Sequence, residues 1–236
     1  MITQKKFPIS VREMCERYEK LQSADVYDVL DQSGFGLGNQ CLSLGIKPLL
    51  PSMVVAGPAF TVKGQQEVRD YTEMERPKID NFGMFRAIYQ DCVVVLNGEK
   101  EPQIAPVGAI MSRGWKNQGA RGMVVDGSTR DGKDVITIPN WAAFVRNCSP
   151  IEARGRWAPN DCMVPIAMPG TLSAQVKVNP YDWVLGDWDA VIVIPQEIAY
   201  EVLLKAEALA AVEAKSKADL VKGDSIWDVH AKYKRL

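Results

Sequence analysis

Residues 119–131 read GARGMVVDGSTRD, a short apolar run enclosed by glycines and followed by charged residues. The run at 122–125 is apolar and rich in valine, which predicts a buried strand. Asp126 and the glycine after it form a turn signal, so we expect the strand to end there. Arg130 and Asp131 then follow at the strand end, where open α/β sheets usually carry functional groups.

A helix is predicted directly upstream, over residues 107–118, with Gly108 at its start. A glycine at this position lets backbone amides approach a ligand closely, and the amino end of a helix favours an anion such as a carboxylate. An arginine can hold a carboxylate or a developing enolate through paired donors, and an aspartate can hold a cation. The segment can therefore form a site for a small anion at Arg130 and Asp131, whereas the dipeptide alone favours an ordinary exposed Arg-Asp pair on a loop.

The rest of the chain predicts a single α/β domain over residues 1–236, because strand-like apolar runs alternate with helical segments. Residues 137–165 contain several prolines and predict a loop-rich connection with short strands. The other predicted strands lie at 53–62, 92–96, 173–178 and 190–194.

Helices are predicted at both ends of the chain. Residues 10–31 have helical spacing, and Ser23 is a candidate cap for a second helix within them. Pro195 is expected to open a long helix, followed by a short final one, so the C-terminal helices span about 195–236. The long helix carries an apolar stripe, which favours core packing or a subunit contact: Ile198, Val202, Ala206, Leu209 and Val212.

Composition excludes several classes of function. The net charge of -1 gives no electrostatic footprint for nucleic acid or a membrane surface, and neither partner is expected. Five scattered cysteines without a CxxC pair indicate reduced thiols and a cytoplasmic location. His230 is the sole histidine, which leaves little for a Ser-His-Asp triad and excludes a His-rich zinc site. A metal would then use carboxylate and water oxygens, as Mg²⁺ does.

Four motifs in order resemble the RraA-like family, which includes 4-hydroxy-4-methyl-2-oxoglutarate aldolases. The family signature G-x-x-G-x-V-x-D-G-x-x-R-D stands here at 119–131. Residues 21–31 are similar to the family's N-terminal helix motif and residues 57–62 to its first strand. Residues 178–195 resemble its later strand pair. The resemblance covers most of the chain and implies a β/β/α sandwich-like domain with a C-terminal helical extension.

The resemblance also implies a reaction and a site. Family aldolases cleave a 2-keto acid or sugar-acid derivative to give pyruvate, and they commonly decarboxylate oxaloacetate. It assigns Asp131 to Mg²⁺, or another divalent cation such as Mn²⁺, and Arg130 to the keto oxygen and the enolate. The backbone amides of Gly108, Ala109, Ile110 and Met111 are assigned to the substrate carboxylate. Family members assemble as trimers or hexamers with sites between subunits.

One departure concerns Ala109, because the aldolases have an aspartate there, and alanine cannot relay a proton. Glu99 and Glu101, expected in the loop before the helix, are the candidates nearest in sequence to replace it. The family also borrows a glutamate from a neighbouring subunit, and Glu197 or Glu201 are candidates for that role.

Two further readings of function stay open. A non-enzymatic regulator that binds a ribonuclease, as RraA does, is favoured by Ala109, whereas the C-terminal extension favours the enzyme. A Schiff-base aldolase would use Lys63, at the end of the 53–62 strand, as its nucleophile.

Overall fold

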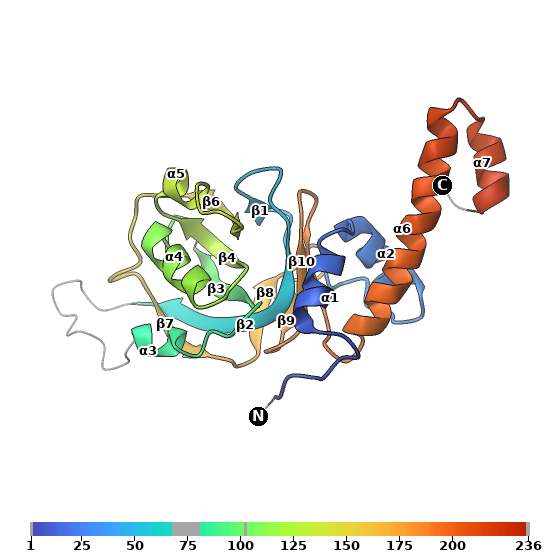
Figure 1. Cartoon of the computed structure of the whole chain (residues 1–236). Coiled ribbons are helices and arrows are strands. Elements are labelled where there is room, and N and C mark those ends of the chain that lie inside the picture. The colour runs from blue at the N-terminus through green and yellow to red at the C-terminus, as the bar shows by residue number, and fades with distance from the viewer. Residues whose placement is uncertain (1, 68–80, 102, 235–236) are drawn as a thin grey trace.

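The structure is a computed structural model that describes residues 2–67, 81–101 and 103–234 (Figure 1). The helices are α1 (Val11–Tyr18), α2 (Ser23–Gln32), α3 (Asn81–Phe85), α4 (Ala109–Asn117), α5 (Gly132–Val135), α6 (Ala199–Val221) and α7 (Ile226–Tyr233). The strands are β1 (Lys47–Pro48), β2 (Val55–Gln66), β3 (Val93–Glu101), β4 (Gly122–Thr129), β5 (Ala142–Val145), β6 (Asn147–Cys148), β7 (Trp157–Cys162), β8 (Ile166–Pro169), β9 (Gln175–Val178), β10 (Trp183–Gly186) and β11 (Val191–Ile194).

One large sheet has the strand order β1-β5-β4-β3-β2-β10-β11, with β6 beside β4 and β7 beside β2. Strands β2 to β5 run parallel, whereas β1, β7, β10 and β11 pair antiparallel. The two remaining strands, β8 and β9, form a separate antiparallel hairpin. The carboxyl ends of β2, β3 and β4 therefore lie together at one edge, as the sequence predicted for an α/β sheet.

Alternating side chains of the parallel strands build two cores. On one face, Met123 and Val125 of β4 pack with Trp115 of α4. On the other face, Val124 packs with Met168 and the rest of the β8–β9 hairpin. Each fully buried side chain of this size contributes about 1.5–3 kcal/mol relative to an exposed one. Hairpin, sheet and helix thus form the three layers of the expected β/β/α arrangement.

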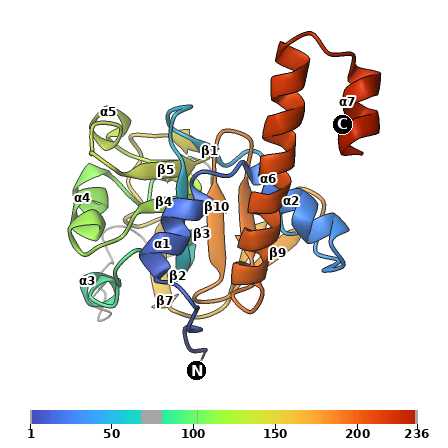
Figure 2. The ribbon, with the colours of Figure 1, turned by 45° about the vertical axis from the view of Figure 1, so that its right-hand side comes forward.

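The N-terminal and C-terminal helices share a third core against β10 and β11 (Figure 2). Tyr18 of α1 stacks on Trp183 with ring centroids 5.5 Å apart, and its hydroxyl donates to the Ala199 carbonyl oxygen. Val202 and Ala206 of the apolar stripe are fully buried in this core, so this part of the stripe is used within the chain. The far half of α6 projects from the body and carries α7 (Figures 1 and 2).

The strand predicted at 53–62 is β2, which continues to Gln66, so Lys63 lies within the strand and not at its end. Two other predicted boundaries were also wrong. Strand β4 continues past Asp126 to Thr129, because Asp126 is buried and paired with Arg146 and the next carbonyl accepts from the Arg146 amide. Helix α6 begins at Ala199 rather than at Pro195, because the intervening residues form a turn in which the Gln196 amide donates to Asp182. Both differences come from partners that are distant along the chain.

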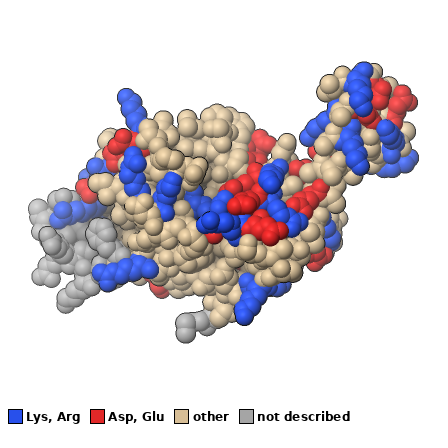
Figure 3. All heavy atoms as spheres, in the orientation of Figure 1, with Lys and Arg blue, Asp and Glu red and all other residues tan. Residues whose placement is uncertain are grey.

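Charges of both signs mix on the face drawn in Figure 3, most densely where α1 and α6 lie. Arg17 of α1 pairs with Glu207 of α6 and with Glu13 one turn earlier in its own helix. Among the residues that the structure describes, we find no helix whose length and hydropathy would let it cross a bilayer.

Candidate functional site

The amino end of α4 is joined to the carboxyl end of β4 by backbone contacts. Val107, just before α4, forms a parallel bridge with Thr129, the last residue of β4. The Arg130 amide donates to the Val107 carbonyl oxygen at 2.8 Å, and the Thr129 hydroxyl donates to the same oxygen at 2.9 Å. This junction brings together the two segments that the sequence proposed for the site.

Gly108 lies in direct contact with both proposed charged residues. A β-carbon built on Gly108 would lie 2.7 Å from Asp131 Oδ2 and 3.3 Å from Arg130 Cβ. The Ala109 amide donates to the same Oδ2 in a long hydrogen bond of 3.4 Å. The glycine is therefore required for close approach, and the helix end already faces a carboxylate.

Asp131 is exposed and has a left-handed backbone, with φ 54° and ψ 38°. A residue other than glycine in this region is uncommon, although aspartate tolerates it better than most. Its carbonyl oxygen accepts from the Asp134 and Val135 amides, which starts the short helix α5. The left-handed turn thus leaves its carboxylate at the amino end of α4.

Arg130 keeps 38% of its side chain exposed at the edge of the site. Its Nη1 lies 3.7 Å from Oε1 of Glu152, whose side chain is 56% exposed. An ion pair this open to solvent contributes little to stability, so it leaves the guanidinium able to bind an anion. Glu152 was missed in the sequence, since it lies within the loop-rich segment and carries no motif.

The first turn of α4 offers amide donors. The first amides of a helix have no partner inside it, and the cap residue here, Gly108, has no side chain that could accept from them. Ala109 is 5% exposed and packs into the α4 core, whereas Ile110 is 86% exposed and Met111 is partly buried. The backbone of 109–111, rather than its side chains, can therefore contact an anion.

The other acidic candidates lie in different places. Glu99 and Glu101 belong to strand β3, not to a loop before the helix, because β3 continues in pairing as far as Glu101. Their side chains lie outside the described residues. Glu197 is exposed in the turn before α6, and Glu201 in its first turn pairs with Lys205 at 3.0 Å.

The donor set at the site fits one kind of cation. Among the described residues, no group of three or more His, Cys, Asp or Glu side chains is arranged to hold a metal ion. Asp131 offers a single exposed carboxylate, and Mg²⁺ is usually held by one or two carboxylates with water in its remaining positions. A site built on Asp131 therefore fits Mg²⁺ or Mn²⁺ and does not fit zinc.

His230 and Lys63 lie apart from this junction. His230 is exposed on α7, as the sequence predicted. Lys63 of β2 is exposed and lines a pocket whose lining does not include Arg130 or Asp131.

Comparison with known proteins shows the family to which the chain belongs. The family described as "RraA-like: Aldolase/RraA" matches residues 23–193, and the chain belongs to that family. Its mixed α/β sheet with C-terminal helices has the RraA-like fold.

Two relatives show how far the likeness extends. A Halalkalibacterium halodurans protein named "Putative 4-hydroxy-4-methyl-2-oxoglutarate aldolase" is 30% identical over 206 residues, covering 86% of each chain. Protein DlpA of Legionella pneumophila is 24% identical over 89% of this chain. That match spans only 32% of DlpA, so this chain has about a third of its length.

Two solved structures are similar. One, described among novel cellulases from microbes associated with the gut ecosystem, has a TM-score of 0.79 and 33% identity, with 91% of each chain covered. The other is RraAS2 of Streptomyces coelicolor, described as an unusual member of the RNase ES inhibitor RraA protein family. It has a TM-score of 0.73 and 22% identity, with 90% of this chain and 99% of that one covered, which shows the fold alone.

Proposed function

We propose that the chain is a divalent-metal-dependent lyase that breaks a carbon–carbon bond in a 2-keto acid or a sugar-acid derivative. The bond is broken by aldol cleavage that gives pyruvate or by decarboxylation of an oxaloacetate-type substrate. One observation carries the proposal: Gly108 brings the amino end of α4 into contact with both Arg130 and Asp131. The aldolase name of the Halalkalibacterium halodurans relative supports the same chemistry.

Each residue has a role in stabilising negative charge. The backbone amides of Gly108, Ala109, Ile110 and Met111 hold the substrate carboxylate at the amino end of the helix. Arg130 donates to the keto oxygen and stabilises the enolate that forms as the bond breaks. Asp131 would hold Mg²⁺ or Mn²⁺, and the cation would supply further positive charge to stabilise the enolate.

Proton transfer separates the two reactions. Aldol cleavage begins with removal of a proton from the substrate hydroxyl, and Ala109 has no group that can accept it. Decarboxylation breaks its bond as CO₂ leaves and requires a proton only afterwards, at the enolate carbon, where water can deliver it. We therefore expect decarboxylation to be the faster reaction, with Glu152 as the base for any aldol cleavage because it lies beside Arg130.

Substitution of Asp131 tests the metal site without relying on turnover. Calorimetric titration with Mn²⁺ should show binding to the wild type and none to Asp131→Asn. Asp134→Asn is the matched control, since Asp134 is also exposed and lies three residues along, in α5. Equal binding by wild type and Asp131→Asn would place the cation elsewhere and remove this part of the proposal.

A second candidate function is regulation of a ribonuclease by direct binding. Ala109 favours this function, because alanine cannot transfer the proton that the aldolase reaction requires. A panel of 2-keto acids tested with Mg²⁺ and Mn²⁺ distinguishes the two functions. If no panel member yields pyruvate or CO₂ while the protein co-purifies with a ribonuclease, the regulator replaces the lyase.

Trapping tests the remaining route, a Schiff base on Lys63. Borohydride added with substrate should leave the mass of the protein unchanged if the cation route operates. A stable adduct on Lys63 would show that the carbon–carbon bond is broken through an imine instead.

A further inference from the structure

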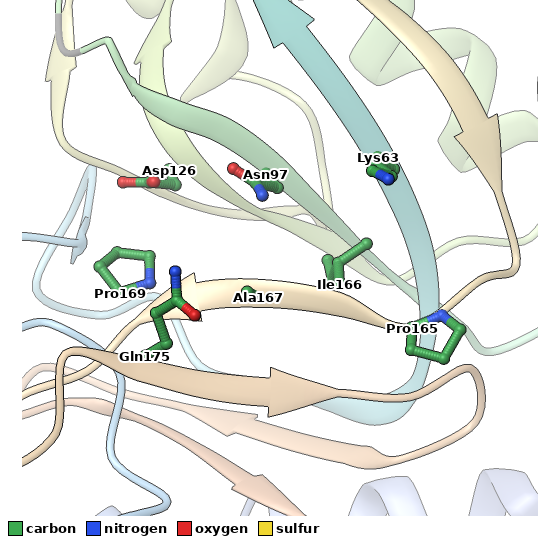
Figure 4. A pocket seen from close by; sticks show the side chains of 8 residues that line it. All are labelled: Lys63, Asn97, Asp126, Pro165, Ile166, Ala167, Pro169 and Gln175. Atoms are coloured by element: carbon green, nitrogen blue, oxygen red, sulfur yellow. The ribbon is translucent and has the colours of Figure 1, made fainter.

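A row of polar side chains crosses the sheet near the carboxyl ends of three parallel strands. Lys63 of β2 is paired in register with Asn97 of β3. Asp126 of β4 comes directly after Val125, whose partner on β3 is Leu96, so Asp126 continues the row. Figure 4 shows the three side chains in line above strand β8.

The row stands at the end of an otherwise apolar face. Further back along the same face, Ala59, Val95 and Val124 pack in the core beneath the β8–β9 hairpin. Where that core ends, a pocket of about 460 Å³ separates the row from the hairpin (Figure 4). The hairpin side of the pocket is lined by Pro165, Ile166, Ala167, Pro169 and Gln175.

Two charged side chains line the pocket, Lys63 and Asp126, and of these only Asp126 is held in an ion pair among the described residues. Asp126 is 1% exposed, and Arg146 Nε donates to its Oδ1 at 2.5 Å, so its charge is neutralised within the protein. Lys63 forms no salt bridge within the described residues, although Asp161 lies opposite it on β7. The Asp161 carboxylate instead accepts from the Cys162 amide.

The backbone around the row departs from regular pairing. The register shifts between Lys63 and Gly64, and again after Leu96 in β3. A β-carbon on Gly98 would lie 2.0 Å from the Asp126 carbonyl oxygen, so only glycine permits this approach of β3 to β4. Irregular pairing of this kind commonly redirects side chains beside binding sites. Burying the Asp126 carboxylate also costs free energy, whereas an apolar side chain could fill the same space without that cost.

We propose that this pocket, which we call the hairpin pocket, binds a small organic carboxylate that carries hydroxyl groups. The ligand carboxylate contacts the Lys63 ammonium, and its hydroxyls bond to the side-chain amides of Asn97 and Gln175, which donate and accept. Asp126 lies four residues before Arg130, about 13 Å along an extended strand. The hairpin pocket is therefore a second site, and the inference does not depend on the lyase proposal.

D-gluconate is the probe, with D-glucose as the neutral comparison, and calorimetry measures binding. We expect the wild type to bind gluconate and not glucose, and Lys63→Met to weaken gluconate binding at least about tenfold through loss of a charge-assisted bond. Lys177→Met should bind as the wild type does, because Lys177 is exposed on β9 outside the pocket lining. Arg130→Met should also retain binding, which separates this site from the one on α4.

Three results would overturn the inference. The first is no gluconate binding by the wild type at millimolar concentration. The second is equal binding by wild type and Lys63→Met. The third is binding that disappears in Arg130→Met but persists in Lys63→Met, since the anion would then occupy the α4 site. Thermal unfolding of each variant confirms that it is folded, and Asn97→Asp gives a second variant of the pocket that should also weaken binding by adding a negative charge.

Discussion

Gly108→Ala is the substitution whose effect follows most directly from the geometry. The new β-carbon would lie 2.7 Å from Asp131 Oδ2, so the carboxylate has to move by about 0.7 Å to reach the 3.4 Å of an ordinary contact. Arg130 Cβ, at 3.3 Å, has to yield by a smaller amount. Displacing a catalytic group by about 1 Å can cost 10²-fold in rate, and we expect a loss of this size in kcat/KM.

The fold should tolerate this change. The Gly108 backbone, at φ -129° and ψ -171°, is open to alanine, and the displaced atom is the end of a side chain. We expect a loss of about 1 kcal/mol in the free energy of unfolding, or about 2–4 °C in Tm.

Gly114→Ala is the matched control for Gly108→Ala, because Gly114 lies in the same helix with nothing within 4 Å of a new β-carbon. It should raise Tm slightly and leave both turnover and Mn²⁺ affinity unchanged. The reasoning is refuted if a folded Gly108→Ala protein keeps wild-type Mn²⁺ affinity and wild-type kcat/KM.

Three other predictions address the base, the C-terminal helices and the assembly. Glu152→Gln should slow aldol cleavage about 10²-fold or more while leaving oxaloacetate decarboxylation and Tm nearly unchanged, as coupled pyruvate assays and thermal unfolding will show. Hydrogen bonds from Lys232, Tyr233 and Lys222 hold the pKa of Asp219 below its usual value. They therefore stabilise α7 fully at pH values above the usual pKa of an aspartate. This stabilisation is lost as the pH falls through the lowered pKa of Asp219. The protection factors of the α7 amides, corrected for intrinsic exchange at each pH, should therefore fall in strong acid and in Asp219→Asn, and stay as in the wild type in the control Asp228→Asn. Light scattering should return a trimer or a multiple of one, and a monomer or dimer would contradict the proposed assembly.

Local patterns predicted much of the fold. The helix expected over 107–118 is α4, because its glycine start and apolar spacing are contained in the segment itself. The strands expected at 92–96 and 122–125 are the cores of β3 and β4, since buried parallel strands read as unbroken apolar runs. The cap predicted at Ser23 was wrong by one residue, since Gln22 is the cap residue and Ser23 begins the helix.

Features that depend on distant partners could not be predicted. The end of β4 depends on Arg146, which pairs with Asp126 twenty residues away and holds a turn-like sequence in a strand. Glu152 reaches Arg130 because its backbone bridges to Ala105, a contact that the sequence of the loop does not indicate. The polar row of the hairpin pocket also depends on distant partners, because Lys63, Asn97 and Asp126 become neighbours only when β2, β3 and β4 pair in register.

The initial rate of pyruvate formation from oxaloacetate, corrected for the rate without protein, tests the central proposal most directly. With Mg²⁺ present, we expect a corrected rate well above zero for the wild type, and a corrected rate of zero after EDTA is added. Arg130→Lys should lose most of the activity, because lysine cannot offer paired planar donors to the substrate. A corrected wild-type rate of zero, or an Arg130→Lys rate equal to that of the wild type, would contradict the proposed lyase activity.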